Sequence, residues 1–423
     1  MSTKNKFTGV LIFGAAFTIR LILFQSSSIT ETLGSRVEIV TPVTSFTRLT
    51  EGLYLFENGV PPYDGGAFHQ APLLLAFFQL LGYLPVIFTK LTFVLMDLIL
   101  AYCLMNIAGI KQQLYYNFPK LEIELKDNVP KEIDPWVVTG FYLFNPLTIA
   151  SCLSKSTIIF TNLSIILGIY YSLKHNKSYG MFWIAMATYL SFYPFMLFLP
   201  LIQIFTNNVE SSGKIIKNEI IGCVGLFVVW LSGLLIFSYF LVGSWDFLGA
   251  TYGVILLLPD LTPNIGLFWY FFIEMFDQFR SFFLVVFQLH AFVFMVPVST
   301  KFRKHPLFSI FILSGIMAIF KSYPSIGDAS LYLAFLPIYS EIIKYMRYNF
   351  LTTNIFCYCS ILSPIFYHLW IYAGSGNANF FYAITLVYTI GNIILLVDAT
   401  FAMFRREFDI WNPDLKNYEI IQK

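Results

Sequence analysis

Long apolar stretches recur through this chain, and they constrain its fold more than any other feature. A helix that crosses a bilayer needs about 20 mostly apolar residues, and by that measure about twelve stretches qualify as transmembrane helices. They begin near Thr8, Pro72, Phe88, Trp136, Thr157, Gly180, Ile220, Phe282, Pro306, Ser330, Leu351 and Phe380. The sequence therefore predicts an all-α polytopic membrane protein.

Charged residues are too scarce to cover a water-facing surface. They make up 12% of the 423 residues, and hydrophobic residues make up 57%, whereas soluble domains carry about 25% charged residues. Lipid as the surrounding solvent permits this composition. The net charge of +2 and the lack of a long basic run argue against a nucleic-acid partner. Since no internal repeat or low-complexity tract divides the chain, we expect one membrane domain over residues 1–423.

The positions of Lys and Arg predict which loops face the cytosol. If the clusters Lys301–Lys304, Lys344–Arg347 and Arg405–Arg406 are all cytosolic, the predicted spans between them cross the membrane in alternating directions. Lys4 and Lys6 place the N-terminus on the same side. About twelve spans then return the C-terminus to the cytosol.

The opposite, luminal side receives the remaining loops. These are the first loop, residues 25–69, the luminal or interfacial segment 244–280, and the turns Ser322–Asp328 and Gly374–Asn379. The N-terminal half admits two arrangements. Strict counting puts the polar loop Lys111–Asp134 in the lumen, whereas a re-entrant segment near Pro72–Pro85 would place it in the cytosol.

The first apolar run, the cysteines and the histidines give no sign of processing or of chemistry in this chain. The first apolar run contains Arg20 and is not followed by a small-residue cleavage site, so we interpret it as a transmembrane helix rather than a signal peptide. The 5 Cys lie in or beside apolar stretches and are interpreted as small buried hydrophobes. The 5 His show no metal-ligand spacing. No metal site and no cofactor is therefore predicted.

The first loop contains a short amphipathic helix. Thr44–Phe56 places Phe46, Leu49 and Leu53 on one face, and a rigid G-V-P-P-Y-D turn follows. A helix that lies on the membrane surface suits an enzyme or receptor for a lipid headgroup. A purely structural luminal cap is the alternative.

The segment Pro259–Arg280 combines helix breakers, aromatic residues and charges. Pro259, Pro263 and Gly266 prevent a helix over Asp260–Asn264, and the aromatic block 268–272 follows. Glu274, Asp277 and Arg280 then recur at a spacing that stacks them on one helix face. These residues predict either a polar groove wall or an interfacial helix with a self-paired polar face.

Two turns between apolar runs offer polar groups on the luminal side. In Lys321–Asp328, Lys321 can snorkel to the interface and Asp328 can cap the next helix. In Ala373–Tyr382, the glycines end one helix, and Asn377 or Asn379 caps the next. Amide side chains at a helix N-terminus also suit a phosphate or a sugar, so both interpretations stay open.

Ionisable residues inside apolar runs are candidate functional groups because burying a charge in lipid is unfavourable. Lys90, Asp97 and Asp398 occupy such positions. Structural pairing is an equally good interpretation of these residues.

Several long strings resemble the phosphatidylinositol-glycan class U family of membrane subunits of the GPI transamidase. They are D-L-T-P-N-I-G-L-F-W-Y-F-F-I-E-M-F (Asp260–Phe276), F-K-S-Y-P-S-I-G-D (Phe320–Asp328), H-L-W-I-Y-A-G-S-G-N-A-N-F-F-Y-A-I-T-L (His368–Leu386), F-N-P-L-T-I-A-S-C-L-S-K-S-T (Phe144–Thr157) and S-W-D-F (Ser244–Phe247). The resemblance runs nearly end to end and implies the endoplasmic reticulum membrane.

The first loop also resembles that of the GPI mannosyltransferases, whose fold is polytopic and GT-C-like. Those enzymes place an Asp-x-Asp-type acidic pair after the first span, where it serves sugar transfer. Counting back from the shared turn at Pro62–Tyr63, that pair falls at Val43 and Ser45. No carboxylate lies there, and Glu38 is the nearest acid upstream. The resemblance therefore implies a transferase scaffold without the catalytic acids.

The leading hypothesis is a non-catalytic GPI transamidase subunit that helps to bind the GPI lipid and docks partner subunits. A cysteine-protease-like subunit would perform peptide cleavage and amide formation. The alternative is an active glycosyltransferase that uses a dolichol-linked sugar, and the missing acids argue against it. A transporter finds little support, because no repeat and no pair of broken helices surrounds a midplane charge.

One luminal groove for the GPI headgroup is expected from the two turns. Its candidate residues on those turns are Asn377, Asn379, Phe380 and Asp328. Glu274 and Asp277 would form the opposite wall and contact amine groups, and Asn264 is the next candidate position.

Overall fold

Helices make up the regular structure of the described part of the chain. The computed structural model describes residues 3–116, 134–207 and 213–415, and within these ranges it contains helices and no strand. The chain forms two compact units. Unit 1 comprises Met1–Ala108 and Pro135–Ala334, and unit 2 comprises Gly109–Asp134 and Phe335–Lys423. The all-α expectation is confirmed.

Unit 1 is a bundle of apolar helices. Each helix satisfies its backbone hydrogen bonds internally, as a lipid surrounding requires. Its longest helices are α1 (Thr3–Leu23), the first part of α5 (Val86–Tyr116), α11 (Gly213–Val242) and α15 (Asp277–Val293). Shorter helices pack among them: α6 (Pro135–Leu143), α7 (Pro146–Leu153), α8 (Ile158–Leu173), α9 (Lys177–Ser191), η2 (Tyr193–Leu197), α10 (Phe198–Thr206), α16 (Met295–Lys301), α17 (Pro306–Phe320) and α18 (Ile326–Leu333).

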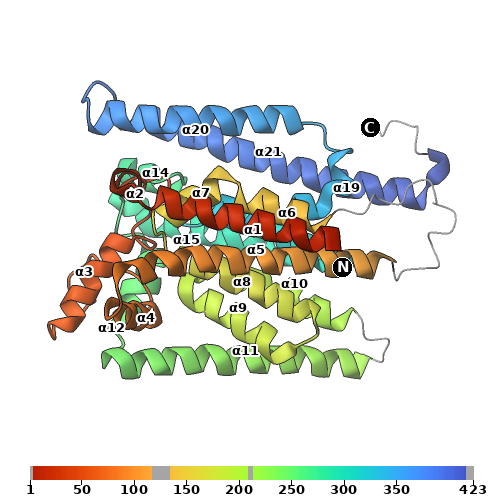
Figure 1. The fold of residues 1–423 in the computed structure, drawn as a ribbon, viewed down its shortest axis with the longest axis horizontal. Coiled ribbons are helices and arrows are strands. Elements are labelled where there is room, and N and C mark those ends of the chain that lie inside the picture. The colour runs from red at the N-terminus through yellow and green to blue at the C-terminus, as the bar shows by residue number, and fades with distance from the viewer. Residues whose placement is uncertain (1–2, 117–133, 208–212, 416–423) are drawn as a thin grey trace. The chain divides into compact units, whose positions relative to one another are not determined.

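Short helices gather at one end of unit 1 (Figure 1). They are α2 (Ser27–Gly34), α3 (Phe46–Glu57), α4 (Pro72–Gly82), α12 (Asp246–Leu248), η3 (Gly249–Gly253), α13 (Val254–Leu257) and α14 (Phe268–Glu274). Figure 1 shows α4 end-on while α5 runs lengthwise, so α4 lies across α5. With 11 residues it is about 16 Å long, too short to span a bilayer.

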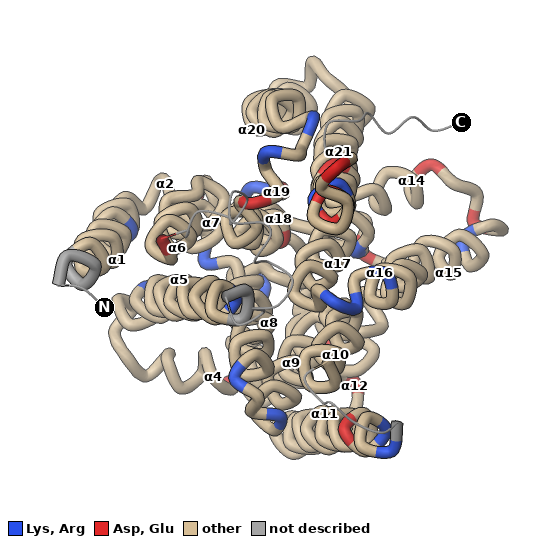
Figure 2. The backbone as a smooth tube through the Cα atoms, turned by 90° about the vertical axis from the view of Figure 1, so that its right-hand side faces the viewer, with Lys and Arg blue, Asp and Glu red and all other residues tan. Residues whose placement is uncertain are grey.

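Basic residues mark the helix ends of unit 1. Lys301 lies in the last turn of α16, and Lys214 and Lys217 lie at the start of α11. Figure 2 shows basic residues at these helix ends.

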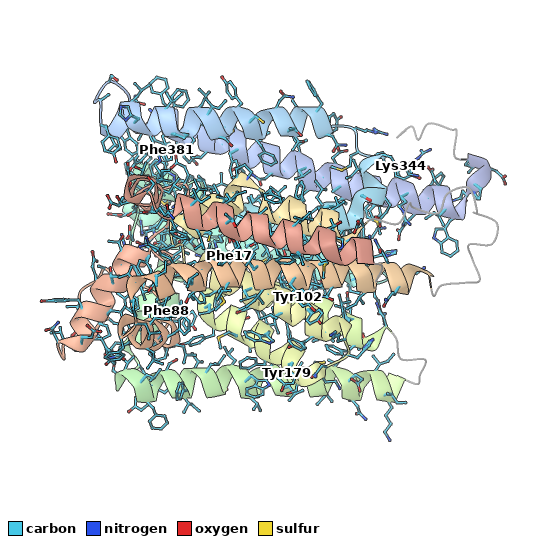
Figure 3. All side chains as sticks on the ribbon, in the orientation of Figure 1. Phe17, Phe88, Tyr102, Tyr179, Lys344 and Phe381 are labelled. Carbon is cyan, nitrogen blue, oxygen red and sulfur yellow. The ribbon has the colours of Figure 1, made fainter. Side chains whose placement is uncertain are left out.

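Unit 2 is built around a helical hairpin of α20 (Asn349–Ile371) and α21 (Ala378–Trp411). It also holds η4 (Pro337–Tyr339), α19 (Ser340–Ile343) and η5 (Pro413–Leu415). Lys344 and Phe381 lie at opposite ends of the hairpin (Figure 3). The carboxylate of Asp398 accepts hydrogen bonds from the backbone N–H groups of Arg347 (3.0 and 2.9 Å) and Tyr348 (2.8 Å). Asp398 therefore has a structural role in the hairpin.

Six helices are long and apolar enough to cross a membrane, or up to eight if each of two bent helix pairs is one span. A polytopic membrane protein is thus supported. The predicted starts all coincide with helices, but the count of about twelve spans is not confirmed. The reason is length, since α8 has 16 residues and α9 and α17 have 15 each. The membrane side of the Lys111–Asp134 loop stays open, and residues 117–133 lie outside the described ranges.

Arg20 and Asp97 form an ion pair inside the helices of unit 1. The guanidinium Nη2 lies 2.8 Å from the carboxylate, and their side chains are 0% and 2% exposed. The hydroxyl of Tyr142 donates to the same carboxylate at 3.0 Å, and Arg20 also donates to the carbonyl of Leu143. Pairing and hydrogen bonding offset the desolvation of both charges, so Asp97 has a structural partner that the sequence did not reveal.

Candidate functional site

The first loop folds into two helices at the end of unit 1. The hydroxyl of Ser45 accepts a hydrogen bond from the backbone of Arg48 and caps α3. Leu49 is fully buried, and Phe46, Leu53 and Phe56 pack against the aromatic core. The predicted amphipathic helix is confirmed. Helix α2 was not predicted, and its capping residue Ser26 was a local signal for it.

An ion pair connects the first loop to the segment that follows α13. Leu258 adopts a left-handed conformation (φ 51°) and ends α13, and the chain then stays non-helical until α14. Arg48 on α3 donates to the carboxylate of Asp260 at 2.7 Å. The other carboxylate oxygen accepts from the backbone and the hydroxyl of Thr262. The predicted break at Asp260–Asn264 is confirmed. Both carboxylate oxygens of Asp260 accept hydrogen bonds.

Asn264 is buried and shapes the backbone of this segment. Its side-chain oxygen accepts a hydrogen bond from the backbone of Gly266 at 2.8 Å. A Cβ added at Gly266 would lie 2.5 Å from the side chain of Pro324. Close packing at Gly266 therefore brings the loop after α13 against the turn Lys321–Asp328. The hydrogen bond between Asn264 and Gly266 therefore stabilises the loop after α13.

The turn Lys321–Asp328 is built on a buried ion pair. The ammonium of Lys321 donates to the carboxylate of Asp328 at 2.7 Å, and their side chains are 4% and 2% exposed. The other oxygen of Asp328 accepts from the backbone of Ser325 in a capping box at the start of α18. Asp328 takes part in capping as predicted, but as the third residue of α18, whose N-cap is Ser325. The expected snorkelling of Lys321 is wrong, because a buried acid lies within its reach.

Hydrogen bonds extend this turn into the bundle. Ser322 donates to the carbonyl of Ile255 at 2.7 Å, and the amide of Gln288 donates to the same carbonyl at 2.8 Å. The hydroxyl of Tyr193 donates to Gln288 at 2.8 Å. We call Arg48, Asp260, Lys321, Asp328, Tyr193, Ser322 and Gln288 the polar cluster of unit 1. It connects α3, α13, α15, η2 and α18 at the loop end of the unit.

Burial and hydrogen bonding set the charge states around this cluster. Burial raises the pKa of Asp260, but hydrogen bonds from Thr262 and Arg48 outweigh it, so the pKa lies below its ordinary value. Burial lowers the pKa of His69. Because Nδ1 of His69 lies 3.0 Å from the carbonyl of Ala250, that nitrogen carries the proton of the neutral ring. A neutral imidazole therefore lies near the ion pair of Arg48 and Asp260.

Glu274, Asp277 and Arg280 do not share one helix face, so that prediction is wrong. Met275 and Phe276 are extended (ψ 153° and 139°) and separate α14 from α15. The helical spacing argument fails across this break. Glu274 and Asp277 are exposed, while Arg280 donates to the carbonyl of Leu258 at 2.7 Å.

The turn between α20 and α21 lies in unit 2. Gly374 has φ 63°, and the backbones of Ser375 and Gly376 donate to the carbonyl of Leu369, so the expected glycine stop is confirmed. Asn377 occupies the N-cap position of α21, but its side chain makes no capping hydrogen bond. This side chain is exposed, as is that of Asn379.

The candidate residues thus fall into three places. Asp328 belongs to the polar cluster, and Asn264 lies beside it. Glu274 and Asp277 lie at the exposed junction of α14 and α15, and the turn residues lie in unit 2. Phe380 in that turn is 53% exposed, and its ring centroid lies 5.9 Å from that of Phe366. That these residues line one groove stays a prediction.

Arg48, Tyr193 and Gln288 were missed as members of the site. Their signal in the sequence was a polar side chain in or beside an apolar run, which is costly to bury without partners. The sequence could flag such residues but could not name their partners.

Comparison with known proteins identifies the family. The family described as "GPI transamidase subunit PIG-U" matches residues 14–388. The chain is 40% identical over 414 residues to the GPI-anchor transamidase component PIGU of Homo sapiens, covering 94% of each chain. It is 38% identical over 392 residues to the GPI transamidase component GAB1 of Saccharomyces cerevisiae, covering 92% of each chain. The chain therefore belongs to the PIG-U family of GPI transamidase subunits.

Proposed function

We propose that this chain is a non-catalytic membrane subunit of the GPI transamidase in the endoplasmic reticulum. It helps to hold the GPI lipid and docks other subunits, and a cysteine-protease-like subunit performs the cleavage and amide formation. Both termini lie in the cytosol. The observation that carries the proposal is the family match over residues 14–388, together with relatives named as components of that complex.

The first loop supports the absence of sugar-transfer chemistry. Ser45, at one expected acid position, caps α3. Glu38, the nearest acid upstream, is held by the guanidinium of Arg36 through two contacts of 2.7 and 3.1 Å. A general base needs a carboxylate that can reach its substrate, whereas this carboxylate is already engaged.

The turn before α21 supports contact with a lipid headgroup. Asn377 and Asn379 present exposed amides at the first turn of a 34-residue helix. The free backbone N–H groups at such an end favour a phosphate, and exposed Phe380 offers a face on which a sugar can stack. Separately, exposed Glu274 and Asp277 of unit 1 offer carboxylates to amine groups.

Exposed apolar helices support a scaffolding role. Large apolar side chains are exposed along α11, α15 and α20. Apolar surface of this extent lies in lipid or in an interface. We expect affinity purification from native membranes to recover a multisubunit complex. Recovery of a monodisperse chain that attaches GPI by itself would contradict the proposal.

The decisive variant is Asn377→Ala combined with Asn379→Ala. We expect the abundance of the complex to stay unchanged while GPI-anchored product falls and free GPI accumulates, because a ligand contact is lost and no capping bond of Asn377 is removed. Immunoblots of the assembled complex and flow cytometry of a GPI-anchored reporter measure the two quantities separately.

Asn354→Ala is the matched control for this variant. Asn354 is an exposed amide on α20 of the same unit, and its side chain donates to the carbonyl of Phe350. It should change neither quantity. If abundance and attachment fall together in the double variant, or if neither falls, these residues are structural and the lipid-contact proposal for this turn fails.

A further inference from the structure

Two lysines lie at the loop end of unit 1, outside the polar cluster. Lys90 is in the first turns of α5, and Lys155 is in the turn between α7 and α8. Figure 3 labels Phe88, close to Lys90 in the chain, at the end of α5 that lies beside α3 and α4. Both lysines are half-buried. Lys155 belongs to one of the strings that carry the family resemblance, yet the proposed function gives it no role.

The backbone holds Lys155 in an uncommon conformation. Its φ is 54°, in the left-handed region. Its N–H donates to the carbonyl of Cys152, and the N–H of Ser156 donates to the carbonyl of Ser151. The ammonium of Lys155 lies 4.6 Å from the ring centroid of Phe46 on α3. The turn thus directs a cation against the aromatic core beneath α3.

Lys90 lies near Lys155. Phe93, three residues after Lys90 on α5, has its ring centroid 5.9 Å from that of Phe46, the ring over which the ammonium of Lys155 lies. The ammonium of Lys90 donates to the carbonyl of Phe24 at 2.9 Å, just after the end of α1. Burial lowers the pKa of Lys155, and the positive charge of Lys90 lowers it further, while Glu31 on α2 raises it. The ammonium groups of Lys90 and Lys155, both half-buried, therefore repel each other.

The pairing of these lysines differs from that of the buried cations elsewhere in unit 1. Arg20 lies 2.8 Å from the carboxylate of Asp97, and Lys321 lies 2.7 Å from the carboxylate of Asp328. Within the described ranges, no carboxylate lies within 4.0 Å of the ammonium of Lys90 or Lys155. Their contacts are a carbonyl oxygen and aromatic faces, which do not neutralise two charges.

An apolar surface adjoins this pair. Tyr83, Leu84, Val86, Ile87 and Phe88 precede Lys90, and each is at least 44% exposed. Val86 and Ile87 lie four and three residues before Lys90, so they share its side of the helix. The site therefore offers cations for an anionic headgroup and apolar side chains for acyl chains.

We propose that Lys90 and Lys155 together bind the phosphate of a membrane phospholipid whose acyl chains lie along the start of α5. Phosphate fits because two ammonium groups supply several N–H donors and neutralise its charge. A phospholipid fits because the apolar surface is continuous with the cationic pair. This site is independent of the proposed GPI contact at the turn before α21, so either proposal can fail alone.

Lipid retention by the purified complex tests the site. The intact transamidase complex carrying Lys90→Gln and Lys155→Gln is purified in detergent, and its bound phospholipids are counted by native mass spectrometry. We expect it to lose one phospholipid that the unaltered complex retains. Lys174→Gln is the matched control, because its ammonium also lies over an aromatic ring, 4.4 Å from the centroid of Tyr170. Equal retention by all three complexes would overturn the proposal.

Conservative variants guard against misfolding. If Lys90→Arg with Lys155→Arg restores the retained lipid while the Gln pair loses it, charge at the site is responsible. If the Arg pair also loses the lipid although complex assembly is normal, the pair is not an anion site.

Amine labelling identifies the source of the phosphate. The delipidated complex is incubated with short-chain phosphatidylglycerol, with diacylglycerol or with inorganic phosphate, and the labelling of Lys155 is followed by peptide mass spectrometry. We expect several-fold protection by phosphatidylglycerol and none by diacylglycerol. Equal protection by inorganic phosphate would overturn the lipid assignment and leave a site for free anions. Lack of protection by both anions would overturn the site itself.

Discussion

The turn Lys321–Asp328 in unit 1 and the turn Gly374–Asn379 in unit 2 look alike in the sequence. Each is a polar, glycine-containing turn between two apolar helices, and each admits a capping role and a ligand role. Their structures differ. The first turn buries its charges as an ion pair and a capping box, whereas the second turn exposes its amides, and Asn377 makes no capping bond. The comparison shows that exposure and partners separate a structural turn from a candidate binding turn.

The largest expected effect on stability is at the buried ion pair of unit 1. Lys321→Ala or Asp328→Ala leaves a buried charge without its partner, which costs about 3–5 kcal/mol. We expect the abundance of the assembled complex to fall strongly, together with GPI attachment, as measured by immunoblot and by a GPI-anchored reporter.

The double variant Lys321→Met, Asp328→Leu serves as the control for this prediction. It removes both charges and keeps the side-chain volume, so we expect it to be more stable than either single variant. Normal abundance of the single variants with a selective loss of attachment would instead make this turn a binding turn.

A smaller effect is expected where the loop after α13 packs on the same turn. In Gly266→Ala, the added Cβ meets the ring of Pro324 at 2.5 Å, and overpacking of this kind costs about 1–3 kcal/mol. We expect a lower melting temperature of the purified complex. Gly225→Ala is the control, because nothing lies within 4 Å of its Cβ position. Equal melting temperatures for both variants would show that the two segments are not tightly packed.

A still smaller effect is expected at Glu38. Its side chain and that of Arg36 form an ion pair and are 10% and 17% exposed, so the effect is scored as GPI attachment per assembled complex. GPI attachment, measured with the reporter, should stay largely intact. A general base contributes about 10²–10⁴-fold in rate, so a loss of that size at normal abundance would revive the glycosyltransferase alternative.

The smallest effect on abundance is expected in the turn of unit 2. A lost N-cap typically costs about 1 kcal/mol, but the side chain of Asn377 makes no capping bond. Asn377→Ala should therefore leave the level of the complex unchanged, as judged by quantitative immunoblot. A clear drop in level would mean that this turn is structural like its counterpart in unit 1.

Most helix positions were predictable, because apolar runs and helix breakers are local features. Pro72 and Pro306 begin helices as expected, and the non-helical stretch at Asp260–Asn264 follows from its prolines. The predicted stack at Glu274–Arg280 failed at Met275, where the chain is extended without a proline or glycine to mark the break. The number of membrane spans was harder to predict from the sequence. A helix counts as a span only if it is long enough, and its length depends on where it ends.

The sequence by itself determined the membrane class, the helix starts, the amphipathic helix of the first loop and the family resemblance. These depend on composition, on periodicity and on strings of neighbouring residues. Only the tertiary structure decided which charges are neutralised, since Arg20 meets Asp97 and Arg48 meets Asp260 across 77 and 212 residues. The physical reason is that a charge is stabilised by whichever opposite charge lies a few ångströms away, and folding, not sequence distance, sets that neighbour.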